Sequence, residues 1–145
     1  MMAETLPAPV FSATYDVSFG DCDPAGIVFY PHMFAWLDRT FHGYLKAAGG
    51  GHAAVCEALN AKGTGLISAD CQFRRPVTDG DDLVVDITAI DWHERTYKVA
   101  YEGRVKGAVA FEGTETRALF VEKEGRMTAG DVSPLKARLQ RGKDG

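Results

Sequence analysis

The spacing of apolar residues divides the chain into one long helical segment and several strand-like segments. Residues 11–19 alternate between apolar and smaller or polar side chains, which is typical of a half-buried strand. Beyond Pro31, apolar residues recur every three or four positions and predict one helix of about twenty residues, which the glycines 49–51 end. The residues of its apolar face are Phe34, Leu37, Phe41, Leu45 and Ala48, widened by Met33, Trp36 and Tyr44.

After a weaker helical segment at residues 52–61, the period of the pattern changes to two. The alternation predicts further strands at residues 67–73, 83–89, 97–105 and 111–121, followed by a short helix from Ser133. Short links between consecutive strands favour antiparallel pairing, and a sheet must cover the long apolar helix. The sequence therefore predicts an α+β fold in which an antiparallel five-stranded curved sheet wraps around one long central helix.

Length and composition limit the classes of protein that fit this pattern. The 145 residues predict a single domain, 1–145, with flexible ends at 1–9 and 142–145. A net charge of −4 argues against a general nucleic-acid binder. Three irregularly spaced cysteines form no disulfide framework, and the four scattered histidines predict no metal site. Because the chain has neither a signal peptide nor a membrane-spanning stretch, we expect it in the cytoplasm.

The segment 19–31 carries the most informative chemistry. It places Asp21 and Asp23 in a Pro/Gly-containing turn directly before the long helix. A carboxylate beside the unpaired N–H groups of a helix N-terminus could attack a carbonyl and leave the oxyanion stabilised. The alternative for Asp23 is a capping or Asx-turn residue, and Asp21 is expected to serve the turn alone. No serine elbow or phosphate loop occurs elsewhere in the sequence.

This segment resembles the 4-hydroxybenzoyl-coenzyme A thioesterases of the hotdog fold. The resemblance is strongest over residues 19–31, continues through Trp36-Leu37-Asp38, and extends loosely over nearly the whole chain. It implies an acyl-coenzyme A substrate, with no cofactor beyond the coenzyme A of that substrate. It also implies a homodimer whose two sheets join, often paired into a homotetramer, with active sites between the subunits.

Three residues take roles from the resemblance. Asp23 matches the catalytic carboxylate, Tyr30 the residue whose backbone N–H binds the thioester oxygen, and Asp38 the acid that meets the ring hydroxyl of the substrate. Asp38 lies about 12 Å further along the helix than Tyr30, so it suits the distal end of an aryl group in the neighbouring subunit. The alternative is that Asp38 is a solvated partner of Arg39 or His42.

Other positions complete the expected substrate site. Phe29 stands where the best-known family member has tryptophan, and Thr64 could line the acyl pocket. Arg95 is the residue expected to contact coenzyme A phosphate, although its loop is less basic than in that member and Glu94 would repel phosphate. Related thioesterases of the Tol-Pal type carry histidine and glutamate at positions 30 and 38, so this sequence sits closer to the aromatic-substrate branch.

The sequence therefore predicts an acyl-coenzyme A thioesterase acting on an aryl thioester such as 4-hydroxybenzoyl-coenzyme A. The carboxylate of Asp23 could form a mixed anhydride or activate a water molecule, and the sequence leaves both open. One alternative keeps the enzyme class with an aliphatic acyl group or an acyl-carrier protein. A second is a non-catalytic acyl-thioester-binding dimer. A hotdog dehydratase would need a histidine paired with a carboxylate in the site, and only His32 is near enough in sequence.

Overall fold

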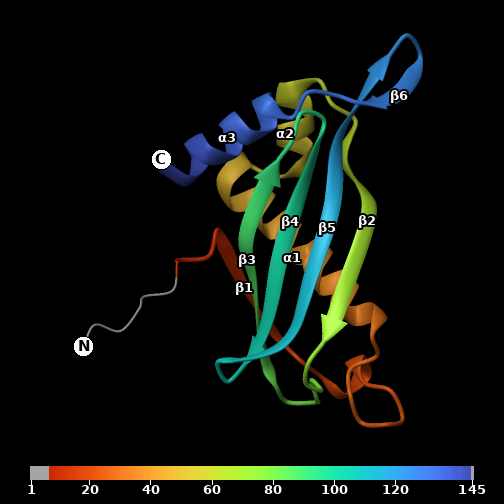
Figure 1. Cartoon of the computed structure of the whole chain (residues 1–145), viewed down its shortest axis with the longest axis vertical. Coiled ribbons are helices and arrows are strands. Elements are labelled where there is room, and N and C mark those ends of the chain that lie inside the picture. Colours follow the sequence, from red (N-terminus) through yellow and green to blue (C-terminus); the bar gives the residue numbers. More distant parts are fainter. Residues whose placement is uncertain (1–6, 145) are drawn as a thin grey trace.

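The computed structural model of the chain describes residues 7–144, which form one antiparallel sheet and its covering helices (Figure 1). The strands follow the order β1-β3-β4-β5-β2, and β6 pairs with β5. The strands are β1 (Phe11–Asp16), β2 (Gly63–Phe73), β3 (Asp82–Trp92), β4 (Thr96–Val105), β5 (Ala108–Lys123) and β6 (Arg126–Ala129). The helices are α1 (Pro31–Gly49), α2 (His52–Leu59) and α3 (Ser133–Asp144), with a 3-10 turn η1 at Phe19–Asp21. The predicted curved sheet around a long helix is confirmed, and short β6 is added to its five strands.

Helix α1 begins and ends where the sequence predicts. Pro31 occupies the first turn, where its missing N–H leaves no hydrogen bond unmade. Gly50 adopts φ 88° and donates its N–H to the carbonyl of Leu45, a left-handed ending that glycine adopts without steric cost. The predicted apolar face is buried at its centre, whereas Phe34 and Ala48 are only half-buried. Its buried apolar side chains are Met33, Trp36, Leu37, Phe41, Tyr44 and Leu45.

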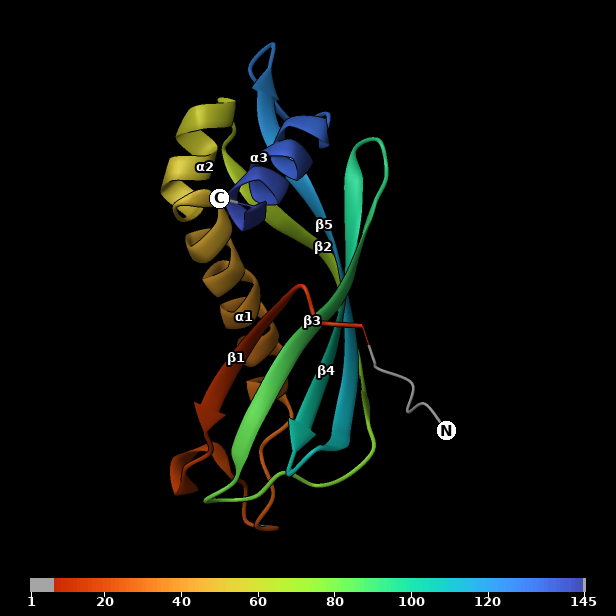
Figure 2. The same ribbon diagram turned by 90° about the vertical axis from the view of Figure 1, so that its left-hand side faces the viewer.

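All three helices lie on one face of the sheet, which curves around α1 (Figure 2). Leu83, Val85 and Ile87 of β3 are fully buried on this face, as the alternation predicts. Gly113 of β5 lets the helix approach closely, because a Cβ atom there would lie 2.7 Å from a methyl carbon of Leu37. The core between α1 and the sheet therefore depends on a glycine as well as on large side chains.

Two strands depart from simple alternation. The register of β3 against β4 shifts between Ile87 and Ala89, so Ala89 is exposed instead of continuing the buried row. Strand β2 forms one edge of the sheet, and Ile67 and Phe73 remain 53% and 52% exposed. Leu66, on the same strand, is also 51% exposed. Of the ends expected to be flexible, residues 142–144 continue α3, residues 1–6 and 145 lie outside the described residues, and the flexibility stays a prediction.

Candidate active site

A tight turn before α1 presents Asp23. The Gly26 N–H donates to the Asp23 carbonyl at 2.9 Å, with Pro24 at the second position of the turn and Gly26 at φ 83°. An isolated bridge between Cys22 and Val28 closes the loop, and the Asp23 N–H donates to the Ile27 carbonyl at 2.9 Å. The backbone thus fixes Asp23 at the neck of a small hairpin.

The two carboxylates of the loop have different surroundings. Asp21 accepts the Ser18 N–H at 2.9 Å and the Ser18 hydroxyl at 3.2 Å through Oδ2, which caps η1, and its Oδ1 lies 3.7 Å from Nδ1 of His32. Asp23 accepts the Ala25 N–H through Oδ1 at 2.8 Å, which is the Asx turn that the sequence left open. Its Oδ2 has no hydrogen bond to another described residue. The turn role therefore uses one oxygen of Asp23 and leaves the other available.

Asp23 and Tyr30 line the same hollow, which has a volume of about 430 Å³. Tyr30 precedes the first residue of α1, and within residues 7–144 no acceptor takes its backbone N–H. Pro31 has no N–H, so the Tyr30 amide is the donor that the helix start offers to a ligand. The other residues around the hollow are mostly apolar: Ile27, Val28, Met33, Phe73, Pro76 and Val77, together with Arg74 and Arg75.

Phe29 and two arginines have different positions relative to this hollow. Phe29 is 47% exposed, does not line the hollow, and packs edge-on to Tyr30 at 5.6 Å between ring centroids. Arg74 and Arg75 both line the hollow. Arg74 forms an ion pair with Glu112 at 2.8 Å, whereas Arg75 has no ion pair within the described part of the chain. Arg75 is therefore a cation in the lining of the hollow that was not selected from the sequence.

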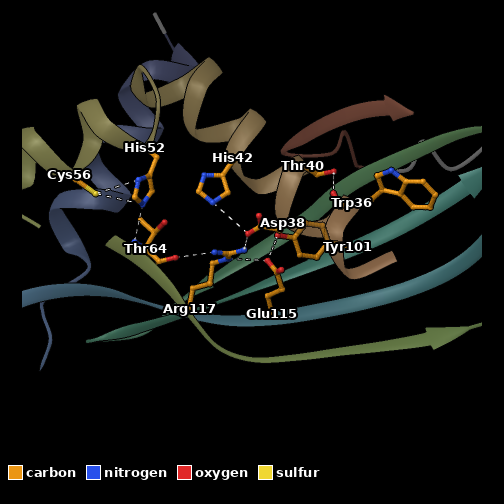
Figure 3. A network of polar contacts seen from close by, with 10 residues as sticks. All are labelled: Trp36, Asp38, Thr40, His42, His52, Cys56, Thr64, Tyr101, Glu115 and Arg117. Carbon is orange, nitrogen blue, oxygen red and sulfur yellow. Dashed lines mark hydrogen bonds and ion pairs between the residues drawn. The ribbon is translucent and has the colours of Figure 1, made fainter. Parts of the chain in front are cut away.

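Asp38 and Thr64 meet elsewhere, through a buried arginine that the sequence did not point to (Figure 3). Arg117 of β5 is 2% exposed and donates to Asp38 Oδ1 at 2.9 Å and to the Thr64 carbonyl at 3.0 Å. Its Nε lies 3.0 Å from Glu115, which also accepts the Tyr101 hydroxyl at 2.5 Å. Asp38 keeps a side chain 55% exposed and also lies 3.5 Å from His42, the partner considered from sequence. Asp38 is thus ion-paired within its own protomer and still open to solvent.

The pKa values in this network follow from burial and charge. Burial alone lowers the pKa of Arg117, but Glu115 and the hydrogen bonds to Glu115 and Asp38 raise it above its ordinary value. Burial also raises the pKa of Tyr101, and Glu115 raises it further. Arg117 is therefore a permanent cation and Tyr101 a permanent hydrogen-bond donor at neutral pH. The Thr64 hydroxyl is buried, has no hydrogen-bonding partner among residues 7–144, and does not line the hollow at Asp23.

His42 gives this network a measurable pH dependence. Burial lowers the pKa of His42 below the ordinary 6.5. The charge of Asp38 raises this pKa, whereas Arg117 and His52 lower it further. Because the pKa of His42 is lower in the folded state than in the unfolded state, folding is favoured at pH values above the unfolded-state pKa. This stabilisation is lost as the pH falls through the folded-state pKa. We expect the melting temperature to fall as the pH is lowered below about 6.5, and to fall less in His42→Gln. Thermal melts of both proteins, with exposed His93→Gln as control, test this, and parallel curves for the wild type and His42→Gln would contradict it.

Arg95 lies at the opposite end of the sheet from the Asp23 loop, in the turn between β3 and β4 (Figure 1). It lines a hollow of about 510 Å³ together with Lys123 and Ser133. Glu94 and Asp131 line the same hollow, so its two cations are offset by two carboxylates. Arg95 was predicted from the sequence as a phosphate contact, but Lys123 was not. The two residues are brought together only by the pairing of β4 with β5.

Two negative findings apply to the part of the chain that the structure describes. Within residues 7–144, no group of three or more His, Cys, Asp or Glu side chains gathers as metal ligands would. No helix in that range is long and apolar enough to cross a membrane. The expectations about cofactors, metal and the cytoplasm stay predictions.

An antiparallel sheet curved around one long helix is the arrangement of the hotdog fold. Its structural neighbours agree. A gentisyl-coenzyme A thioesterase superposes with a TM-score of 0.73 at 25% identity, covering 86% of this chain and 98% of that chain. The 4-hydroxybenzoyl CoA thioesterase of Pseudomonas sp. strain CBS-3 superposes with a TM-score of 0.76 at 23% identity, covering 88% of this chain and 96% of that chain. The predicted hotdog fold is confirmed.

The sequence comparisons then identify the family. The sequence model of the thioesterase superfamily matches residues 25–109, beginning just after Asp23, and the chain belongs to this superfamily. It is 30% identical over 83 residues to the 4-hydroxybenzoyl-CoA thioesterase of Pseudomonas sp. (strain CBS-3), an alignment spanning 56% of this chain and 58% of that enzyme. It is 25% identical over 131 residues to a 1,4-dihydroxy-2-naphthoyl-CoA hydrolase of Synechococcus sp. (strain CC9311), spanning 86% of each. The predicted resemblance to a family of thioester hydrolases is confirmed.

Proposed function

We propose that the protein hydrolyses the thioester bond of an acyl-coenzyme A, with Asp23 as nucleophile or general base and the Tyr30 amide as oxyanion donor. The observation that carries this proposal is the hollow that Asp23 and Tyr30 line together at the start of α1. A thioester carbonyl held there would have a carboxylate on one side and an unoccupied helix N–H on the other. Members of the superfamily to which the chain belongs are named for this reaction.

The chemistry requires little beyond these two groups. Asp23 Oδ2 is available to attack the carbonyl carbon and form a mixed anhydride, or to take a proton from an attacking water. Negative charge then develops on the carbonyl oxygen, where the Tyr30 N–H and the partial positive charge of the helix start would stabilise it. The coenzyme A thiolate is a good leaving group, so no general acid is obligatory.

We further propose an aryl acyl group. The hollow is lined mainly by apolar side chains, which suit a ring. Three related enzymes are named for hydroxylated aromatic acyl groups: 4-hydroxybenzoyl, gentisyl and 1,4-dihydroxy-2-naphthoyl. Asp38 is the proposed acceptor for a ring hydroxyl, Phe29 and Thr64 are proposed to complete the acyl site, and Arg95 to contact coenzyme A phosphate.

The proposed assembly is a homodimer formed through β2, paired further into a homotetramer. Strand β2 offers an unpaired edge, and its exposed apolar residues Leu66, Ile67 and Phe73 would be covered by a second copy. Such pairing would explain why Asp38 lies outside the hollow of its own protomer. An Asp38 side chain would then serve the hollow of the neighbouring subunit.

An aliphatic acyl group or an acyl-carrier protein is the competing substrate class. The observation that favours it is the balance of charges around Arg95, where Glu94 and Asp131 would weaken a grip on the phosphates of coenzyme A. The non-enzymatic alternative is a dimer that binds acyl thioesters in the same hollow without hydrolysing them.

Thiol release from a panel of purified thioesters tests the proposed function. We expect kcat/KM to rank 4-hydroxybenzoyl-coenzyme A above benzoyl-coenzyme A, and both above hexanoyl-coenzyme A and hexanoyl acyl-carrier protein. If the aryl thioesters have the lowest kcat/KM, the substrate class is aliphatic and the aryl proposal is wrong. Binding of the thioesters without any thiol release would instead support the non-catalytic dimer.

A further inference from the structure

The side chain of Arg117 is held from several directions. Its three guanidinium nitrogens each have a different partner: Glu115 on the same strand, the Thr64 carbonyl on β2, and Asp38 on α1. Its Cζ also lies 4.3 Å from the centroid of the Phe41 ring, so the planar group is stacked on the helix as well. Because the guanidinium is a rigid fork with fixed donor directions, these contacts leave it one orientation.

Asp38 is held through only one of its oxygens. Arg117 and His42 both approach Oδ1, at 2.9 Å and 3.5 Å. No hydrogen bond joins Oδ2 to another residue of the range 7–144, and the side chain is 55% exposed. A carboxylate in this state is a directed acceptor: one oxygen is bound to the protein and the other faces outward.

Stability alone does not account for this arrangement. A buried ion pair such as Arg117–Glu115 gains little over well-packed apolar side chains, because both charges lose their hydration. Inside the sheet, Glu115 accepts hydrogen bonds from both Arg117 and the Tyr101 hydroxyl, but the bond from Arg117 to Asp38 leads out of the core to the surface. The free-energy cost of burying the pair is explained if Asp38, at the outer end of the network, contacts the substrate.

We propose that Arg117 is a positioning residue that fixes Asp38 as a hydrogen-bond acceptor for a hydroxyl group on the acyl part of the substrate. The inference rests on the proposed function and adds to it a residue that acts on specificity without contacting the substrate. Arg117 itself is sealed inside the protomer and does not touch the substrate. Its effect passes through the orientation and charge of Asp38.

The test is the ratio of kcat/KM for 4-hydroxybenzoyl-coenzyme A to that for benzoyl-coenzyme A. Asp38→Asn removes the acceptor charge and is expected to lower this ratio by about ten- to a hundredfold. Glu115→Gln/Arg117→Gln removes both buried charges together, so that neither is left unpaired, and is expected to lower the ratio by most of the same factor. The triple variant that adds Asp38→Asn should fall no further than Asp38→Asn alone, because the two changes act on one interaction.

A merely structural role for Arg117 has a different signature. The double variant would then lower kcat/KM for both thioesters equally and leave the ratio at its wild-type value, which would overturn the inference. Arg117→Lys provides the second variant if the double variant does not fold. It keeps the charge beside Glu115 but lacks the fork that reaches Asp38 and the Thr64 carbonyl together, so the ratio should fall and an unchanged ratio would again overturn the inference.

The same assays separate this inference from the proposed function. Wild-type protein that releases thiol from both thioesters with a ratio near one would retain the thioesterase and remove the role of Asp38 and Arg117. Wild-type protein that releases thiol from neither would remove the proposed function itself, and the inference with it.

Discussion

Replacing Asp23 with asparagine is expected to lower kcat for thioester hydrolysis by about 10²–10⁴-fold while the protein still folds. Asparagine has nearly the shape of aspartate, and its side-chain oxygen can still accept the Ala25 N–H that holds the turn. It carries no negative charge, so it can neither attack the carbonyl nor take a proton from water. Initial rates of thiol release and thermal melts of both proteins measure the two halves of this expectation.

Asp21→Asn is the matched control, because it makes the same chemical change two positions away in the same loop. Asp21 is engaged with Ser18 and does not line the hollow, so this variant should keep most of its turnover even if its melting temperature falls slightly. An Asp23→Asn protein with turnover close to that of the wild type would eliminate the carboxylate mechanism. Equal losses in both variants would mean that the loop, and not the Asp23 charge, is what activity requires.

The fold was predictable because its signals are local. The helix is indicated by a period of 3.6 residues that ends in glycines, and the strands by a period of two with short links between them. Both patterns are found in residues that are neighbours in the sequence. The bulge that exposes Ala89 was not predictable, because a register shift depends on the neighbouring strand. Nor did alternation reveal that Ile67 and Phe73 lie on an edge, since strand order is decided by pairing between distant segments.

The same distinction applies to the candidate site. Asp23 and Tyr30 were found because one short loop carries both, and the structure places them around one hollow. The link from Asp38 to Arg117 spans 79 positions of sequence and could not be found from spacing. One signal was available: Glu115 and Arg117 share the inward face of a strand with Phe111 and Gly113, and opposite charges on a core-facing row indicate a buried pair.

Replacing Ile67 with lysine is expected to dissociate the proposed dimer and to lower activity with it. Ile67 is 53% exposed on the β2 edge. In a two-fold symmetric interface each subunit contributes the same surface, so the substitution is present twice. About half of each isoleucine side chain is left to be buried by the partner, so losing this burial twice weakens association by about 1.5–3 kcal/mol, or about 10–100-fold in Kd. Lysine also places two like charges near the symmetry axis. Sedimentation velocity over a range of protein concentrations measures the Kd of both proteins.

Activity should follow the assembly state if the neighbouring subunit completes the site. Specific activity of Ile67→Lys should then rise with enzyme concentration, as dimer re-forms, while the wild type shows no such dependence above its Kd. Met127→Lys is the control, because Met127 is 62% exposed on β6, away from the β2 edge, and receives the same charge. An Ile67→Lys protein that remains dimeric would exclude β2 as the interface. A monomeric variant with full specific activity would show that Asp23 and Tyr30 work without a second subunit.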